Sequence, residues 1–140
     1  MPSLSVNGVS LYYEEAGRGF PVVFSHEFAG GYRSWEPQMR FLSRSYRCIA
    51  YNHRGFPPSS VPESVEAYSQ DLLIENLRGL VLQLGIQRAH FVGCSMGAQT
   101  VLMFALRYPE VCRSIVVASA GSGSIARNGW EETIAETVRT

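Results

Sequence analysis

The stretch GCSMG at residues 93–97 decides the fold of this 140-residue chain and carries its clearest chemical signal. It fits the pattern G-x-S-x-G, in which a serine stands at a sharp turn between a strand and a helix. Residues 89–94 form an apolar run typical of a buried strand, and residues 96–108 show a helical pattern. This context favours an exposed serine at a strand–helix corner over a helix N-cap serine between two chance glycines.

Ser95 is the candidate nucleophile of this stretch. The turn is expected to force its backbone into a strained conformation that presents Oγ at the carboxyl edge of the sheet. Gly93 and Gly97 are needed because a Cβ at either position would collide with the neighbouring strand or helix. The backbone N–H of Met96, in the first turn of the following helix, points at the same space, where the helix dipole favours a developing oxyanion.

A serine nucleophile needs a base, and no histidine follows Ser95 in this sequence. His26 or His53, which precede it, would have to be recruited instead, and that alternative stays open. We expect a nucleophile without the rest of its catalytic machinery.

The composition describes a single globular domain with no net charge. Apolar residues make up 46% of the chain, and 12 basic residues balance 12 acidic ones. This balance argues against nucleic acid or an anionic membrane surface as the main partner. The N-terminal residues lack the pattern of a signal peptide, and no apolar run approaches the ~20 residues that a membrane span needs.

The three cysteines indicate a reducing compartment. Cys48, Cys94 and Cys112 have neither the number and spacing of a disulfide framework nor the clustering of a zinc site. We therefore expect a cytoplasmic protein with free, buried thiols and with neither a metal nor a cofactor.

Alternating strand and helix patterns surround the GCSMG stretch. An Asn7-Gly8 turn between two alternating runs predicts an N-terminal hairpin, because both central positions of a type I′ turn need positive φ. Strands are further predicted at residues 21–25, 47–51, 89–94 and 114–119, and helices from Ser34, over 64–84 and over 96–108. This order predicts an α/β fold with a mostly parallel sheet. A flexible joint at residues 121–124 leads to a last predicted helix at 128–140.

A loop after the strand at 21–25 adds to a pattern that resembles the α/β-hydrolase superfamily, in particular the α/β-hydrolase-1 group. The loop HEFAGG at residues 26–31 resembles the HGxxG loop of that family. The resemblance implies that the backbone N–H of Phe28 supplies a second oxyanion donor and that His26 is a structural hydrogen-bonding residue. Glu27 stands where glycine is usual, so its side chain must point away from the site or change the polarity there.

A second loop, NHRGFPPS at residues 52–59, resembles the D-x-R-G-x-G-x-S turn of the same family. Asn52 stands where the family has aspartate, and Pro57 stands where it has the second glycine. The resemblance implies that this turn braces the oxyanion loop, with Arg54 bonding carbonyl groups. His53 is expected at the surface or behind the site rather than as a base.

The resemblance covers the first half of the family pattern and implies its fold and activity. The implied sheet order is 1-2-4-3-5-6, in one partial domain over residues 1–140, with the core strands in 1–120 and the start of a cap region in 121–140. The implied reaction is hydrolysis of a carboxylic ester, a lactone or a related small acyl substrate through Ser95. The acid and the histidine are missing, so the chain alone is expected to be inactive. A non-catalytic binding or interaction module is the alternative.

The same resemblance sets two further expectations. A serine rather than an aspartate at the strand–helix corner argues against dehalogenase and epoxide-hydrolase chemistry. The strand at residues 114–119 is expected to be an open apolar edge, which invites self-association with another chain.

Overall fold

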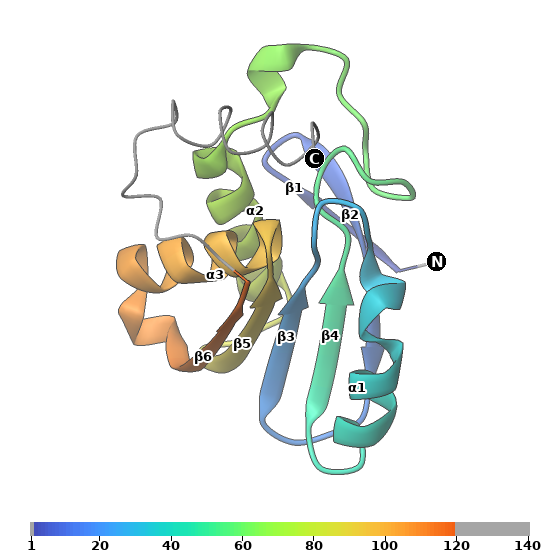
Figure 1. The fold of residues 1–140 in the computed structure, drawn as a ribbon, viewed down its shortest axis with the longest axis vertical. Helices are drawn as coiled ribbons and strands as arrows, with labels where there is room; N and C mark the ends of the chain where they lie inside the picture. Colours follow the sequence, from blue (N-terminus) through green and yellow to red (C-terminus); the bar gives the residue numbers. More distant parts are fainter. Residues whose placement is uncertain (1, 120–140) are drawn as a thin grey trace, which may run out of the picture.

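The computed structural model describes residues 2–119, which form a six-stranded sheet in the order β1-β2-β4-β3-β5-β6 (Figure 1). The strands are β1 (Ser3–Val6), β2 (Val9–Ala16), β3 (Pro21–Ser25), β4 (Arg47–Tyr51), β5 (Ala89–Cys94) and β6 (Cys112–Ala118). β2 pairs antiparallel with both β1 and β4, whereas β4, β3, β5 and β6 are parallel neighbours. The predicted fold class and strand order are confirmed.

The N-terminal hairpin turns at Asn7 and Gly8, as the sequence predicts. Their φ angles are 49° and 81°, both in the left-handed region that a type I′ turn requires. The turn places Val6 opposite Val9, and both side chains are buried in a small apolar cluster. The hairpin is therefore fixed by its turn chemistry and by the apolar side chains that it buries.

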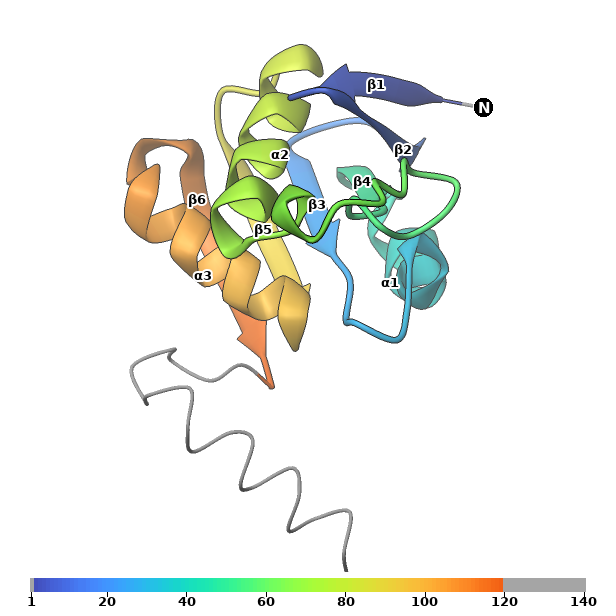
Figure 2. The same cartoon turned by 90° about the horizontal axis from the view of Figure 1, so that it is seen from above.

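Helical segments cover both faces of the sheet. They are η1 (Tyr32–Trp35), α1 (Glu36–Leu42), η2 (Val65–Ala67), α2 (Gln70–Gln83), α3 (Met96–Arg107) and η3 (Pro109–Val111). Seen from above, α2 and α3 lie together and α1 lies apart from them (Figure 2). The alternation along β3 explains this, because Val23 joins the core under α2 and α3, whereas Val22 and Phe24 pack with Trp35 and Met39. Within residues 2–119, no helix combines the length and the apolar character of a membrane span.

The helix predicted over residues 64–84 is shorter than expected. α2 begins at Gln70, because Ser69 is extended, with φ −159°, and its Oγ accepts the N–H of Leu72 at 3.1 Å as an N-cap. Residues 65–67 form the separate turn η2. The apolar repeat Leu73, Leu77, Leu80 and Leu84 lies within α2 and its C-cap residue, so it gives no support to a helix before Ser69.

Ser34 does not cap the first helix, and that prediction is wrong. It lies inside η1, and its Oγ donates to Oε1 of Glu27 at 2.7 Å. α1 instead follows Trp35 as its N-cap residue and has Pro37 in its first turn. A short 3₁₀ turn thus intervenes between the oxyanion loop and the helix.

β6 starts two residues earlier than predicted, because its pairing with β5 already begins at Cys112 opposite Ala89. A register irregularity lies between Ala89 and His90. The predicted joint at residues 121–124 and the predicted helix at 128–140 lie outside the described residues, as does nearly all of the cap region.

The cysteines are free thiols, but only one of them is fully buried. Cys48 is buried, whereas Cys94 and Cys112 are half-buried, which corrects the expectation that all three are buried. Burial and the neighbouring Glu110 raise the pKa of Cys112 to about 11. This thiol is therefore protonated, and a poor nucleophile, at neutral pH.

Candidate active site

Ser95 lies at the corner between β5 and α3, where the sequence places it. Its backbone has φ 53° and ψ −114°, a conformation that costs an L-residue on the order of 1–3 kcal/mol. The corner is held from both sides, because the Ser95 N–H donates to the Ala118 carbonyl at 2.9 Å and its own carbonyl accepts the Gln99 N–H at 3.0 Å. The side chain of Ser95 is exposed. Its hydroxyl therefore stands at the carboxyl edge of the sheet, open to a small molecule.

Two glycines allow this corner to close. A Cβ on Gly93 would collide with the backbone of Gly97, in the first turn of α3. A Cβ on Gly97 would collide with the carbonyl groups of Ser25 and His26, at the end of β3. The start of α3 therefore packs directly against the segment that leads into the oxyanion loop, and only glycine fits at either contact.

The two predicted oxyanion donors lie at this same edge. Met96 is the first residue of α3, and Phe28 lies in the loop after β3. Ser25, the last residue of β3, is in register with Gly93 on β5, so the loop and the start of α3 are neighbours. Phe28 and Met96 both line one cavity of about 500 Å³. The first N–H groups of a helix have no intrahelical partner, so the Met96 amide is available to an anion. The oxyanion role of both amides stays a prediction.

His26 is fully buried, and both of its ring nitrogens have partners. Nδ1 donates to the Glu27 carbonyl at 2.7 Å, and Nε2 accepts the backbone N–H of His53 at 3.0 Å. Burial lowers the pKa of His26, so the ring is neutral at pH 7. With both nitrogens occupied, His26 cannot serve Ser95 as a base, and its bonds instead tie the oxyanion loop to the segment after β4.

His53 is fully buried and lies behind the loop rather than at the surface. Its Nε2 is 2.9 Å from Oγ of Ser25, which in turn is 3.0 Å from the hydroxyl of Tyr51. Burial and the neighbouring His26 hold the pKa of His53 well below its ordinary value. Its Nδ1 has no hydrogen-bond partner among the described residues.

This buried cluster of Ser25, Tyr51 and His53 was not foreseen from the sequence. The sequence feature that could have predicted the cluster is a polar residue at the end of each of two apolar strands, Ser25 and Tyr51, followed by His53 two residues after Tyr51. Because β3 and β4 are parallel and Ser25 is in register with Tyr51, both side chains reach the same edge of the sheet.

Arg54 binds a carbonyl group, as expected, but that carbonyl lies in η2, so the prediction that Arg54 braces the oxyanion loop is wrong. Its Nε donates to Oδ1 of Asn76 on α2 at 2.7 Å, and its Nη1 donates to the carbonyl of Ala67 in η2 at 2.8 Å. The side chain is buried, and Nη2 has no partner within residues 2–119. Arg54 therefore holds the segment before α2, because its long side chain points to that side of the sheet.

Within the turn at residues 52–59, Asn52 provides the bracing that was expected of this turn. Its Oδ1 accepts the backbone N–H of Tyr32 at 2.6 Å, and its Nδ2 donates to the carbonyl of Pro57 at 3.1 Å. A neutral amide can accept on one side and donate on the other, so Asn52 links the end of the oxyanion loop to the following turn.

Glu27 fits the site by turning away from it. Its carboxylate accepts the hydroxyl of Ser34 at 2.7 Å, in η1. A Cβ on Gly30 would collide with this carboxylate, so the loop folds closely around it. The negative charge is thereby held on the η1 side of the loop.

None of the three histidines is bonded to Ser95. His26 and His53 are engaged as described, and His90 lies 2.5 Å from Oγ of Ser114, near the amino end of β5. The residues described also contain no group of His, Cys, Asp and Glu that could hold a metal ion. Residues 2–119 thus provide a nucleophile with no bonded base.

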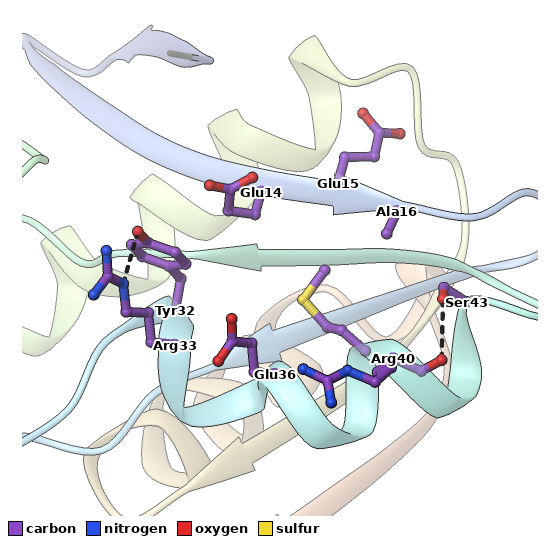
Figure 3. A pocket seen from close by; sticks show the side chains of 9 residues that line it. Glu14, Glu15, Ala16, Tyr32, Arg33, Glu36, Arg40 and Ser43 are labelled. Carbon is purple, nitrogen blue, oxygen red and sulfur yellow. Dashed lines mark hydrogen bonds between the residues drawn. The ribbon is translucent and has the colours of Figure 1, made fainter.

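A second groove lies between β2 and α1 and is unrelated to Ser95 (Figure 3). Charged side chains of both signs line it, but several are engaged elsewhere. Glu15 pairs with Arg47, and Glu14 accepts the hydroxyl of Tyr12. Since β4 and β3 separate β2 from β5, this groove adds nothing to the chemistry of Ser95.

The sequence comparisons agree with this geometry. The family model of the alpha/beta hydrolase fold matches residues 21–138. Epoxide hydrolase 3 of Mus musculus is 30% identical over 127 residues, which are 89% of this chain and 35% of that protein. A putative non-heme chloroperoxidase of Synechocystis is 32% identical over 133 residues, 93% of this chain and 48% of that protein.

Solved structures show the same likeness in three dimensions. An epoxide hydrolase of Bacillus megaterium superposes with a TM-score of 0.79 at 32% identity, over 81% of this chain and 40% of the other. The meta-cleavage product hydrolase CumD of Pseudomonas fluorescens superposes with a TM-score of 0.79 at 32% identity, over 86% and 45%. The chain spans less than half of the length of each of these relatives.

Proposed function

This chain belongs to the α/β-hydrolase fold family, and on that premise we propose that it supplies the nucleophile and the oxyanion site of a serine hydrolase acting on carboxylic esters, lactones or related acyl compounds. The observation that carries the proposal is the strained, exposed corner at Ser95, with φ 53°. A strained backbone conformation persists only where surrounding contacts impose it. At Ser95 this conformation directs the hydroxyl toward solvent, where a substrate can reach it.

The proposed reaction is acyl transfer. Oγ of Ser95 bonds to the carbonyl carbon, its proton passes to a base, and the carbonyl electron pair moves to oxygen as an oxyanion. The N–H groups of Phe28 and Met96 bind that oxyanion, the leaving group departs with a proton, and water then releases the acid. The base and its acid partner come from outside residues 2–119.

Ser95 as the nucleophile argues against the epoxide hydrolysis for which several relatives are named. A carboxylate that opens an epoxide forms an ester, which water can cleave afterwards. A serine hydroxyl that opened an epoxide would form an ether, which water does not cleave, and the protein would be blocked after one event. We therefore propose acyl substrates rather than epoxides for Ser95.

The 140-residue chain is expected to have very low turnover by itself. Loss of the base from a catalytic triad costs on the order of 10⁶ in kcat, while the oxyanion hole and binding retain about 10³-fold acceleration over water. A test of the proposal must therefore detect a single chemical event at Ser95 rather than turnover.

Covalent labelling with a fluorophosphonate probe provides that test. Ser95 forms the phosphorus–oxygen bond, fluoride leaves, and hydroxide accepts the proton that no base takes. We expect slow labelling that accelerates with pH, maps to Ser95 by peptide mass spectrometry, and disappears in Ser95→Ala. Ser45, an exposed serine distant in sequence from the corner at Ser95, is the internal control and should stay unlabelled. Equal labelling of Ser45 and Ser95 would contradict an activated nucleophile.

A non-catalytic binding module is the second candidate, and one observation favours it. No histidine of the chain is bonded to Ser95, so residues 2–119 hold a ligand-sized cavity beside a serine that lacks a base. A binding module would take up a small acyl ligand without reacting. Absence of labelling at Ser95 at every pH, together with retained ligand binding, would favour this candidate.

A further inference from the structure

The cavity that Phe28 and Met96 share points to the substrate class. We infer that it binds an aryl group of the substrate, so that the preferred ligands are aryl-bearing acyl compounds that carry no positive charge. The inference rests on the proposed function only in identifying the bound molecule as a substrate. Binding of the aryl group itself depends on the cavity walls and not on Ser95.

One wall of the cavity is aromatic and exposed. The Phe28 side chain is 74% exposed, an unusual position for a large apolar ring. Its ring meets that of Phe56 edge to face, with centroids 5.9 Å apart and planes at 88°. His26 in turn packs edge to face on Phe56 at 4.7 Å. The Phe56 ring is thus held from behind by a buried histidine, while the Phe28 ring is left to contact a ligand.

A further part of the lining comes from the junction between η2 and α2 and from α2 itself. Tyr68 and Leu73 form it, and Met96 lies at the α3 end. The Tyr68 ring rests against Gly55, where a Cβ would lie 2.8 Å from a ring carbon, and its hydroxyl donates to the Pro62 carbonyl at 2.7 Å. These contacts fix the ring, so this part of the lining is formed before a ligand arrives.

The size and chemistry of the cavity suit a fused aromatic ring. An apolar cavity of about 150 Å³ admits benzene, and small-molecule sites span about 300–1,000 Å³. The volume here is about 500 Å³, and five of its lining side chains are aromatic, aliphatic or thioether groups: Phe28, Phe56, Tyr68, Leu73 and Met96. Edge-to-face and sulfur contacts with a ligand ring are both available.

The charge of the lining disfavours cationic ligands. Arg54 is the one ionisable cation among the lining residues, and no carboxylate accompanies it there. Its hydrogen bonds go to the neutral oxygens of Asn76 and Ala67, and no ion pair involving Arg54 occurs within residues 2–119. A buried guanidinium without a counter-ion repels an ammonium group and favours a neutral or anionic ligand.

A ligand series on the full 140-residue chain tests the inference without any substitution. The probes are 2-(1-naphthyl)ethanol, its saturated decahydronaphthyl analogue, 1-naphthylacetate and 1-naphthylmethylammonium. We expect the neutral naphthyl alcohol to bind about fivefold tighter than the saturated analogue because of ring–ring contacts. The ammonium should bind at least about tenfold more weakly than the acetate. Calorimetry gives the affinities, and amide NMR shifts at Gly55, Ser69 and Leu73 give the location.

A matched pair of variants on one helix provides the second arm. Leu73→Trp fills the cavity and should weaken naphthyl binding at least about tenfold. Leu82→Trp makes the same change on α2 at a side chain that is 57% exposed and outside the cavity, and it should leave binding unchanged. The NMR spectrum of each variant without ligand shows whether the variant is folded. If Leu73→Trp does not fold, the ligand series on the unmodified chain tests the aryl site by itself.

The outcomes separate this inference from the proposed function. Ser95→Ala should retain naphthyl binding, because the cavity does not depend on the hydroxyl. Naphthyl binding without fluorophosphonate labelling would support the cavity and refute the nucleophile. Labelling of Ser95 together with equal affinity for all four probes, or with NMR shifts elsewhere, would support the nucleophile and overturn the aryl site.

Discussion

At the scale of single residues, the site depends on buried polar side chains that bind one another. Ser25, Tyr51 and His53 form a hydrogen-bonded group behind the oxyanion loop, and His26 connects that loop to the backbone of His53. Both imidazoles are neutral because burial disfavours their charged forms. Protonation of either ring would place a charge beside the other, with centroids 4.6 Å apart.

The two histidines make stability depend on pH. Their folded pKa values lie below the ordinary 6.5, so the unfolded chain binds protons at a higher pH than the folded chain. The free energy of unfolding should therefore fall as the pH decreases below about 6.5, by at most about 1.4 kcal/mol per pH unit for each histidine. His53→Gln should lower this slope in urea unfolding between pH 7 and pH 5, because the pKa of His53 lies well below its ordinary value. An unchanged slope would show that His53 is not buried in its neutral form.

At the scale of elements, capping residues rather than apolar periodicity decide where α2 starts. The predicted helix begins at residue 64, whereas its apolar repeat begins only at Leu73. Ser69 is extended and its Oγ accepts the Leu72 N–H, so the helix starts after Ser69. The preceding turn η2 is held in place by Arg54, a residue of another segment, whose guanidinium donates to the Ala67 carbonyl. The boundary matters for function because Tyr68 and Leu73, on its two sides, both line the cavity.

Two serine substitutions distinguish the true start of α2 from the predicted one. Ser69→Ala removes the capping acceptor and should lower the free energy of unfolding by about 1 kcal/mol. Ser64→Ala, at the predicted start of the helix, should change it by no more than about 0.5 kcal/mol because Ser64 is an exposed residue. Denaturant unfolding measures both changes in free energy. A larger effect at Ser64 than at Ser69 would support a helix that starts at residue 64.

At the scale of the whole molecule, the sheet ends at β6, which pairs with β5 alone among the described strands. Val116 is 54% exposed and Val117 is 36% exposed, so apolar side chains of this edge strand face outward on both faces. We propose that this edge associates with another copy of the chain, since an exposed apolar edge strand is a template for pairing.

A lysine on this edge tests the association. Val116→Lys should shift the chain toward monomer in light scattering over a concentration series, because a charge on an edge strand opposes pairing. Val65→Lys is the matched control, since Val65 is 82% exposed in η2 and far from the edge, and it should leave the association unchanged. An unmodified chain that stays monomeric throughout the series would refute the proposal.

The sequence by itself determined the order of strands and helices, the hairpin turn at Asn7-Gly8 and the corner at Ser95. These features depend on local chemistry: positive φ at the turn, glycines around the serine, and apolar residues in the strands. The sheet order that the structure confirms was implied by the family resemblance, because the handedness of βαβ connections does not say which strands are neighbours.

Only the tertiary structure decided which polar side chains meet. Arg54 binds Asn76, Asn52 binds Tyr32, and His53 meets Ser25, pairs that are 20 to 28 residues apart in the chain. Such contacts depend on which strand ends lie side by side and on the direction of each side chain, and neither is written in a local pattern. The aryl-sized cavity has the same origin, because its walls come from four segments that only the folded sheet brings to one edge.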